Sequence, residues 1–317
     1  MRLRWAFGLL ACALVGVGAA AAPLRVCLDF FPNPNHVPLY VALDEGLFGD
    51  LEIELIVPAN PSDPVKLVAA RTIEIALTPQ INFLIARSEG LPVLSVGALV
   101  DRSLGGLLGL ADAGIGSLAD LVGLRIGYAL APLEPILWET MLACDGIPVS
   151  EVELINVGYA TVASLLSGSV DAIGAFRNFE MIQVELWGET PVFFPQEAHC
   201  IPETYDIVLV AHPKLLEERG GEVQVFLDGL ARGIARTRED PAQALEAFFA
   251  AEPDLDDELN RRSFEATLPL FAEGARHDDP WVWWEIQAYL HEKGLVAAKL
   301  PLDALYTAVY LPPREGE

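Results

Sequence analysis

Amides, an imidazole and aromatic rings crowd into one short segment, Phe30–His36. It follows the apolar run Leu24–Asp29, which has the length of a buried strand, and leads into a helical pattern that Asn35 is suited to cap. Its two prolines hold their preceding residues in an extended conformation, so the loop is stiff. Such groups could grip a small, flat, polar molecule; the alternative is a capped turn with an incidental histidine. We select as candidate ligand contacts Phe31, Asn33, Asn35, His36 and Tyr40.

The segment Gly174–Glu180 repeats this arrangement after another predicted strand, Val170–Ala175. It carries aromatic, guanidinium, amide and carboxylate groups. Glu180 opens the next predicted helix, where the helix dipole favours a negative charge. In the alternative interpretation, Glu180 only balances that dipole and Arg177 is a surface charge. The candidate ligand contacts from this segment are Phe176, Asn178 and Glu180.

Three further loops carry polar groups at predicted strand ends: Gly127–Glu134, Thr78–Gln80 and Pro202–Asp206. In each of them a purely structural role and a ligand contact are equally compatible with the sequence. They add three candidates of second rank, namely Glu134, Gln80 and Tyr205.

No motif of a catalytic centre occurs in the chain. The segment Gly114–Ala119 fits G-x-G-x-x-A, but it has no basic residue nearby and does not stand early in a βαβ unit. Walker A, H-E-x-x-H, G-x-S-x-G and C-x-x-C motifs are missing, and the other histidines lack metal-ligand spacing. We therefore expect a binding protein and no enzyme, with no catalytic residues, no metal and no cofactor.

Strands and helices must hold these segments, and apolar runs of strand length alternate with helical patterns along the chain. The predicted strands are Leu24–Asp29, Leu51–Val57, Ile73–Leu77, Val93–Leu99, Arg125–Ala129, Val152–Val157, Val170–Ala175, Pro191–Phe194 and Ile207–Ala211. The predicted helices between them are His36–Gly46, Asp63–Ala70, Gln80–Ser88, Leu133–Cys144, Tyr159–Leu166 and Phe179–Leu186. This alternation indicates an α/β protein with mostly parallel sheets flanked by helices.

Two such runs, followed by a helical tail, predict two lobes with a cleft between them. We place one lobe at residues 23–110 plus 212–317 and the other at 111–211, with the tail returning to the first lobe. Ligands bind beyond the carboxyl ends of parallel strands, and the candidate segments follow strand ends of this kind.

The N-terminus predicts export. In residues 1–22, Arg2 and Arg4 precede the apolar run Trp5–Val17, and Ala20–Ala22 fits a signal-peptide cleavage site. The alternatives are a retained membrane anchor and lipidation at Cys12. No later stretch has the length and apolarity of a membrane span, so we expect a periplasmic or extracytoplasmic protein.

The amino-acid composition excludes several classes of binding partner. Among 317 residues, 45 are acidic and 20 basic, and a net charge of −25 argues against nucleic acid and against a polybasic membrane-surface protein. The hydrophobic content of 52% excludes disorder. Cleavage would leave Cys27, Cys144 and Cys200, which allow at most one disulfide; we expect inert buried thiols.

Three segments together resemble a known family. Asp29–His36 followed by Pro38–Ala42, the segment Pro61–Ala70, and Gly174–Glu180 are similar to the NMT1/THI5-like substrate-binding proteins, close to the thiamine-precursor pyrimidine-binding proteins of ABC importers. The resemblance implies the two-lobed periplasmic-binding-protein fold of type II. It implies a hydroxymethyl- or formylaminomethyl-pyrimidine ligand, and an ABC permease with its ATPase as partners of a monomer.

An aminopyrimidine needs an aromatic platform, a carboxylate for its amine or protonated ring nitrogen, and amides for the rest of its edge. We expect Glu180 and Asn178 to pair with the ring edge, and three aromatic residues to wall the site. Other relatives bind riboflavin or sulfonates, but a sulfonate needs cationic donors, and Arg177 is the one base in a candidate loop. The yeast-type branch synthesises the pyrimidine from a histidine and pyridoxal phosphate, and carries a cysteine cluster that this chain lacks.

Overall fold

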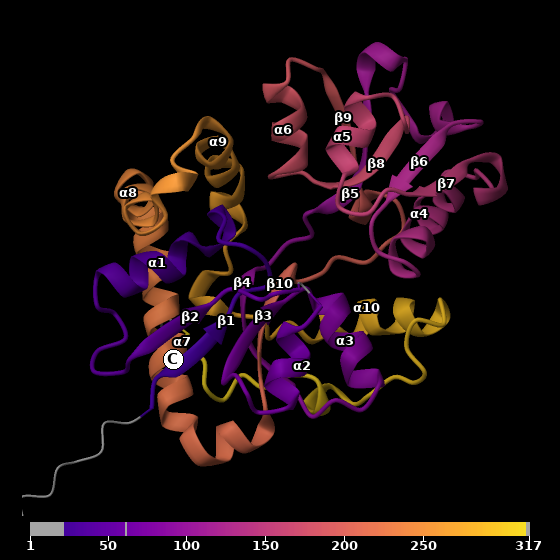
Figure 1. Ribbon diagram of the computed structural model, residues 1–317. Coiled ribbons are helices and arrows are strands. Elements are labelled where there is room, and N and C mark those ends of the chain that lie inside the picture. The colour runs from indigo at the N-terminus through magenta and orange to yellow at the C-terminus, as the bar shows by residue number, and fades with distance from the viewer. Residues whose placement is uncertain (1–21, 61, 315–317) are drawn as a thin grey trace, which may run out of the picture.

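The computed structural model describes residues 22–60 and 62–314. Within them the chain forms two lobes, each built around its own five-stranded sheet (Figure 1). The predicted signal segment, apart from its last residue Ala22, and the candidate lipidation site Cys12 lie outside the described residues. None of the helices in the described ranges is long and apolar enough to cross a membrane.

The sheet of the first lobe has the strand order β2-β1-β3-β10-β4. Strands β1, β2 and β3 run parallel to one another, whereas β10 runs antiparallel to both β3 and β4. The bounds are Leu24–Cys27 (β1), Ile53–Ile56 (β2), Ile75–Thr78 (β3), Leu94–Val100 (β4) and Ile207–Ala211 (β10).

Both faces of this sheet are covered by helices, which explains why its strands are almost continuously apolar. Ile75 and Leu77 point into a core shared with α1, α7 and α8, while Ala76 between them belongs to the opposite core, shared with α2, α3 and α10. The helices are α1 (Val37–Asp44), α2 (Pro64–Ala69), α3 (Gln80–Ser88), α7 (Pro213–Glu239), α8 (Pro241–Ala251), α9 (Glu258–Thr267) and α10 (Pro280–Glu292).

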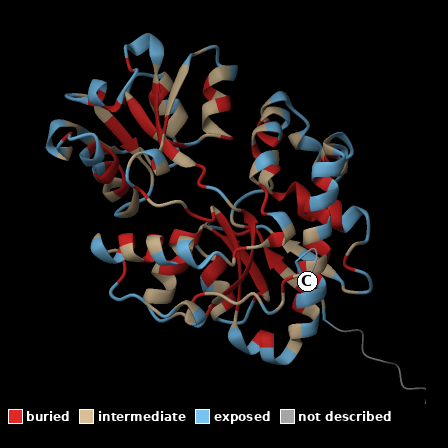
Figure 2. Cartoon of the chain, turned by 180° about the vertical axis from the view of Figure 1, so that it is seen from behind, coloured by how far each residue is buried: buried red, intermediate tan, exposed pale blue. Residues whose placement is uncertain are grey.

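The second lobe repeats the plan with the strand order β7-β6-β8-β5-β9. Strands β6, β7 and β8 are parallel, and β5 is antiparallel to β8 and β9. The strands are β5 (Gly105–Leu110), β6 (Arg125–Tyr128), β7 (Glu153–Asn156), β8 (Ala172–Phe176) and β9 (Pro191–Pro195), and the helices are α4 (Leu133–Cys144), α5 (Thr161–Leu166) and α6 (Glu180–Leu186). In both lobes the central strands are buried, the edge strands β2, β7 and β9 are only partly buried, and the outer faces of the helices are exposed (Figure 2).

The two crossings between the lobes differ from the predicted boundaries. Strand β5 was expected in the first lobe, yet it pairs only with strands of the second sheet; β10 was expected in the second lobe, yet it lies in the first sheet. The crossings are therefore at residues 101–104 and 196–206. They run side by side, since the Ser103 N–H donates to Glu203 Oε1 at 2.6 Å and the Leu104 N–H to Asp206 Oδ1 at 3.3 Å. The glycine-rich β5 gave no strand signal from which the first crossing could be predicted.

A disulfide joins Cys144, at the end of α4, to Cys200 in the second crossing, with Cα atoms 5.8 Å apart. The expectation of buried thiols is wrong for these two residues, because their proximity arises from the tertiary fold and leaves no mark in the sequence. For Cys27 the expectation is confirmed: the thiol is free and buried, and burial raises its pKa to about 11.

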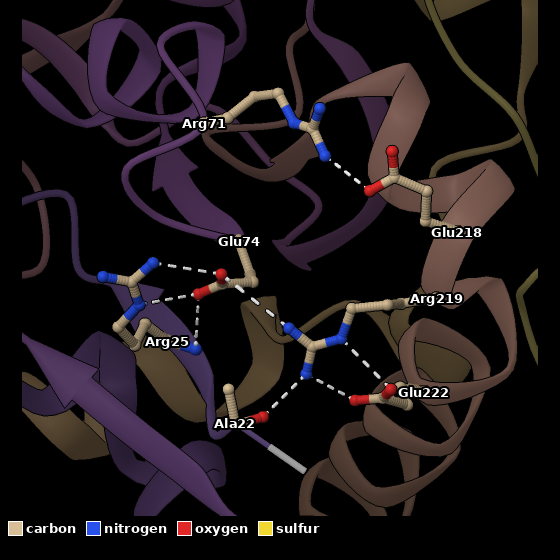
Figure 3. A network of polar contacts seen from close by, with 7 residues as sticks. All are labelled: Ala22, Arg25, Arg71, Glu74, Glu218, Arg219 and Glu222. Atoms are coloured by element: carbon tan, nitrogen blue, oxygen red, sulfur yellow. Dashed lines mark hydrogen bonds and ion pairs between the residues drawn. The ribbon is translucent and has the colours of Figure 1, made fainter.

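A polar network holds the start of the chain's first strand against α7 (Figure 3). Glu74 accepts hydrogen bonds from the backbone and guanidinium of Arg25, and Arg219 lies within ion-pair distance of the same carboxylate. Arg219 also donates to the Ala22 carbonyl oxygen and pairs with Glu222. The network therefore ties β1 and the residue segment before it to α7.

Candidate ligand-binding site

A cavity of about 500 Å³ lies between the two lobes. Its lining comes from the segments that follow the carboxyl ends of β1, β3, β6, β7 and β8, together with the second crossing, as expected for parallel sheets. Five of the predicted contact residues line it, and they come from both lobes and the crossing: Gln80, Glu134, Phe176, Glu180 and Tyr205.

Two carboxylates from the second lobe face this cavity. Glu134 Oε2 accepts a hydrogen bond from the Ala129 N–H at 2.7 Å, and Glu180 Oε2 accepts one from the Phe176 N–H at 2.9 Å. Each side chain thus closes the strand-to-helix turn in which it stands. Burial raises the pKa of both carboxyls, and the charge of Glu134 raises that of Glu180 further. Within the described residues neither one forms an ion pair.

A third carboxylate, Asp206, enters the cavity from the second crossing. Burial raises its pKa to about 7, although the hydrogen bond from the Leu104 N–H and the charge of Arg177 lower it. The sequence marked the segment ending at Asp206, but the choice there fell on Tyr205, since nothing in the sequence shows which side chain turns inward.

Two buried hydrogen-bond donors in the cavity lining have no partner among the described residues. Gln80 uses its Oε1 atom to accept the Tyr205 N–H at 3.0 Å, while its Nε2 atom is unpaired. The indole Nε1 of Trp138 is likewise unpaired, and this side chain is only 3% exposed. Buried donors are normally satisfied, so both call for an acceptor on a bound molecule. Trp138 could have been suspected from its position four residues after Glu134 on α4.

Aromatic rings stand at the mouth of the cavity. Phe30, Phe176 and Tyr159 line it and are 40%, 44% and 69% exposed. Large exposed rings next to a cavity are suited to stack on a flat ligand, because stacking adds to the free energy of burial. Phe30 and Tyr159 were not among the predicted contacts; Phe30 is the immediate neighbour of Phe31, which was.

Most of the Phe30–His36 segment satisfies its own polar groups. Asn33 Oδ1 accepts the Asn35 N–H at 2.9 Å, so Asn33 and not Asn35 caps the short helix that begins here. The Asn33 N–H donates to Nδ1 of His36 at 3.2 Å, and His36 Nε2, which then carries the proton, donates to Asp29 Oδ1 at 2.8 Å. His36 is fully buried, and neither it nor Asn33 lines the cavity.

Two further candidates from this region lie elsewhere. Phe31 is 63% exposed and packs edge-on against Phe30, outside the cavity lining. Tyr40 is buried between α1 and α8, where its hydroxyl donates to Glu252 Oε1 at 2.7 Å and its ring meets Phe248 edge-on. Packing within the first lobe accounts for Tyr40.

Asn35 and Asn178 meet each other across the two lobes. The Nδ2 group of Asn178 donates to Asn35 Oδ1 and to Thr267 Oγ1, both at 2.8 Å. Close by, Glu185 of α6 pairs with Arg262 of α9. Neither asparagine lines the cavity, so the structure places both at a contact between the lobes. Asn178 lies in the turn before α6, two residues before Glu180.

The charged side chains that line the cavity are all acidic. No Lys, Arg, His or Cys is found among the described residues that line it. In the described part of the chain there is also no cluster of side chains suited to hold a metal ion. The site can therefore offer carboxylates, neutral donors and ring faces to a bound molecule.

Comparison with known proteins identifies relatives of this chain. A family model described as NMT1/THI5 like matches residues 33–244. A protein of Haemophilus influenzae whose name assigns it to thiamine biosynthesis is 34% identical over 287 residues, covering 89% of this chain and 91% of its own length. The formylaminopyrimidine-binding protein of Halalkalibacterium halodurans is 33% identical over 80% of this chain and 78% of its own length.

A 4-amino-5-hydroxymethyl-2-methylpyrimidine phosphate synthase of Legionella pneumophila is 28% identical over 91% of this chain and 92% of its own length. Among solved structures, the periplasmic aliphatic sulphonate binding protein of Escherichia coli superposes with a TM-score of 0.73 at 15% identity, covering 93% of this chain and 95% of that one. This likeness confirms the predicted two-lobed fold of periplasmic binding proteins.

Proposed function

The chain belongs to the NMT1/THI5-like family, and from that premise we propose that it captures a thiamine-precursor aminopyrimidine in the cavity between its lobes. As the solute-binding protein of an ABC importer, it would deliver this ligand to a membrane permease. Formylaminopyrimidine binding is the activity in the name of one relative at 33% identity, which supports this ligand class.

The observation that carries the proposal is a pair of half-buried carboxylates, Glu134 and Glu180, which line a cavity with aromatic rings and with no cation among its described residues. An aminopyrimidine complements this arrangement, because its amino group donates to a carboxylate while its ring offers a face for stacking. Its ring nitrogens, or a formyl or hydroxyl oxygen on its side arm, can accept from Gln80 Nε2 and Trp138 Nε1.

The expected strength follows from these contacts. A hydrogen bond to a charged group contributes about 1.5–3 kcal/mol, and an aromatic stack about 0.5–1.5 kcal/mol beyond burial. Micromolar binding requires about 8 kcal/mol. The ligand would therefore need several contacts of both kinds, together with burial of its ring, to reach that affinity.

A synthase activity is disfavoured by the position of the histidine. The synthase reaction that the family resemblance implies consumes a histidine, but His36 is fully buried with both ring nitrogens engaged, and it lies outside the cavity lining. A sulfonate ligand is disfavoured because three carboxylates and no cation line the cavity among the described residues. Riboflavin remains a ligand to be included in the test.

Export supports the transport role. The predicted signal peptide at residues 1–22 and the Cys144–Cys200 disulfide both suit an oxidising extracytoplasmic compartment. We propose that the mature protein is periplasmic or otherwise extracytoplasmic, and that its partners are a permease and the associated ATPase. The division into lobes at the two crossings would let ligand binding close the cavity.

Isothermal titration calorimetry of the mature protein tests the proposal. We expect 4-amino-5-hydroxymethyl-2-methylpyrimidine or its formylaminomethyl analogue to bind at micromolar Kd or tighter. Riboflavin and an alkanesulfonate serve as comparison ligands. Binding of either of these, with no heat from any pyrimidine, would refute the proposed function.

A further inference from the structure

The charge distribution of the cavity also bears on the form in which the ligand is bound. Building on the proposed function, we propose that the cavity selects planar amidine cations, and that it holds its aminopyrimidine protonated on the ring nitrogen beside the amino group, between Glu134 and Glu180. A protonated 4-aminopyrimidine is a cyclic amidinium ion: two N–H groups point the same way and carry a shared positive charge. A carboxylate accepts such a pair of donors with both oxygens.

The first ground is that the carboxylates are uncompensated. Glu134, Glu180 and Asp206 all line the cavity, and the groups of the chain that hydrogen-bond to their carboxylates are neutral backbone N–H groups. Among the described residues no ion pair reaches any of the three. Buried charges without partners are costly, and a cation bound between them would relieve both the burial and their mutual repulsion.

The second ground is that two hydrogen-bond donors of the lining match the acceptors on the other edge of the same ligand. Gln80, 1% exposed, and Trp138, 3% exposed, offer N–H groups that nothing in the described chain accepts. A protonated aminopyrimidine still has an unprotonated ring nitrogen and, on its side arm, an oxygen. A ligand bearing only donors would leave both N–H groups unsatisfied.

Two further charged groups lie near the cavity without lining it. Asp29 accepts a hydrogen bond from His36 and adds negative charge, whereas Arg177 is paired with Glu197. Both act on the pKa of Asp206, in opposite directions. Glu203 accepts the Ser103 N–H in the crossing. Of the phenols, Tyr205 has a pKa raised to about 12 by burial, so it stays neutral at the pH values of interest.

The proton balance of binding is simple. If the facing carboxyl carries the proton before binding, the proton moves to the ring nitrogen and none is exchanged with solvent. If the carboxylate is already ionised, the ring nitrogen takes its proton from solvent or arrives protonated. The bound complex has one proton shared between the facing carboxyl group and the ring nitrogen of the ligand. Affinity for an aminopyrimidine should therefore fall at low pH, where both of these groups are protonated, and at high pH, where neither is.

Benzamidine and benzamide separate charge from shape. Both are flat and nearly equal in size, but benzamidine is a permanent amidinium ion near neutral pH and benzamide is neutral. At pH 7.5 we expect benzamidine to bind at least about tenfold more tightly, the value of one charge-assisted hydrogen bond. Its affinity should decrease only on the acid side, whereas that of the aminopyrimidine should decrease on both sides.

Carboxamide variants identify the residues. Glu134→Gln and Glu180→Gln should each remove the preference for benzamidine over benzamide. Glu151→Gln, an exposed change of the same charge in the second lobe, should keep it. Circular dichroism and thermal melting verify that each variant is folded, and benzamide binding gives a readout that does not depend on charge.

The outcomes distinguish this inference from the proposed function. Equal binding of benzamidine and benzamide, or an aminopyrimidine affinity that stays constant up to high pH, would overturn the inference and leave pyrimidine transport intact. A preference for benzamidine without any pyrimidine binding would support amidine selection and refute the pyrimidine as the ligand.

Discussion

The segments Phe30–His36 and Phe176–Glu180 occupy equivalent positions, each following a parallel strand of its own lobe and leading into a helix. Both are rich in aromatic and polar side chains. In the first, Asn33 and His36 use their polar atoms within the segment or on Asp29. In the second, Glu180 is anchored through one oxygen by the Phe176 N–H and still faces the cavity.

The difference shows that position at a strand end does not by itself make a side chain available to a ligand. A side chain there is available to a ligand only if local hydrogen bonds leave some of its polar atoms unused. Phe30 is the exception in the first segment, because an aromatic ring has no polar group to satisfy and can line the cavity at 40% exposure.

The largest effect that this comparison predicts is on affinity at Glu180. Glu180→Ala removes the buried carboxylate that faces the ligand, so we expect about 100-fold weaker pyrimidine binding, or about 2.7 kcal/mol. Titration calorimetry measures it. The variant should remain folded, since the half-buried Glu180 makes no ion pair and only the acceptor of the Phe176 N–H is lost; unchanged affinity would place the ligand elsewhere.

The equivalent change in the first segment should act on stability. His36→Ala leaves the Asn33 N–H and the Asp29 carboxylate without their buried partner, and should lower the free energy of unfolding by about 1–3 kcal/mol. Urea denaturation measures this loss. Pyrimidine affinity of the folded variant should change less than about threefold; a loss as large as at Glu180 would break the comparison.

A smaller effect is expected where the two segments touch. Asn178→Ala removes both hydrogen bonds from the second lobe to Asn35 and Thr267, each contributing about 0.5–1.5 kcal/mol. We expect affinity to fall about three- to tenfold through less complete closure. Small-angle scattering should show less compaction on adding ligand than in the wild type; identical compaction would exclude a role in closure.

The pH dependence of stability should respond to Asp206. Burial raises the pKa of Asp206 to about 7 in the folded protein, whereas in the unfolded chain it is about 4. The contribution of Asp206 to the free energy of unfolding is therefore fully present below about pH 4 and is lost as the pH rises through 7. Asp206→Asn should lack this loss and be more stable than the wild type at pH 8 by about 1 kcal/mol, a value reduced because the cavity admits water. Melting curves of the ligand-free proteins from pH 4.5 to 8 test the trend, and a constant difference would contradict it.

The smallest effect is expected at Phe31, whose ring is 63% exposed outside the cavity lining. Phe31→Ala should change stability by less than about 0.5 kcal/mol and affinity by less than about twofold. Phe30→Ala, one position earlier, is the matched control and should weaken binding by a larger factor. A larger loss of affinity in Phe31→Ala than in Phe30→Ala would show that Phe31, and not Phe30, stacks on the ligand.

Much of the fold could be predicted from local patterns. The bounds of α4 were predicted as Leu133–Cys144, and the structure has the same ones, because apolar spacing and the flanking Pro132 and Asp145 are local signals. Strand β5 was missed since its sequence, Gly-Gly-Leu-Leu-Gly-Leu, lacks the β-branched residues that mark a strand. The Cys144–Cys200 pairing depends on the path of the second crossing, which no local signal records.

The site was predicted in outline for the same reason. Strand ends and helix starts can be read locally, and Glu134, Glu180 and Gln80, chosen on that basis, line the cavity. That they contact a ligand stays a prediction. The inward turn of Asp206 and the unpaired indole of Trp138 could not be found, as both depend on how the lobes and crossings meet.

Gly174 leaves the space that the Trp138 ring occupies in the cavity lining. A Cβ atom on Gly174 of β8 would lie 2.5 Å from Trp138 Cζ2 and 3.4 Å from Glu134 Oε2, so any larger residue must push the indole out of its place. A side chain at this position would thus displace both the ring and the unpaired Nε1 donor that it carries. A pocket for a bulkier molecule would need a smaller residue at position 138 before position 174 could accept any side chain.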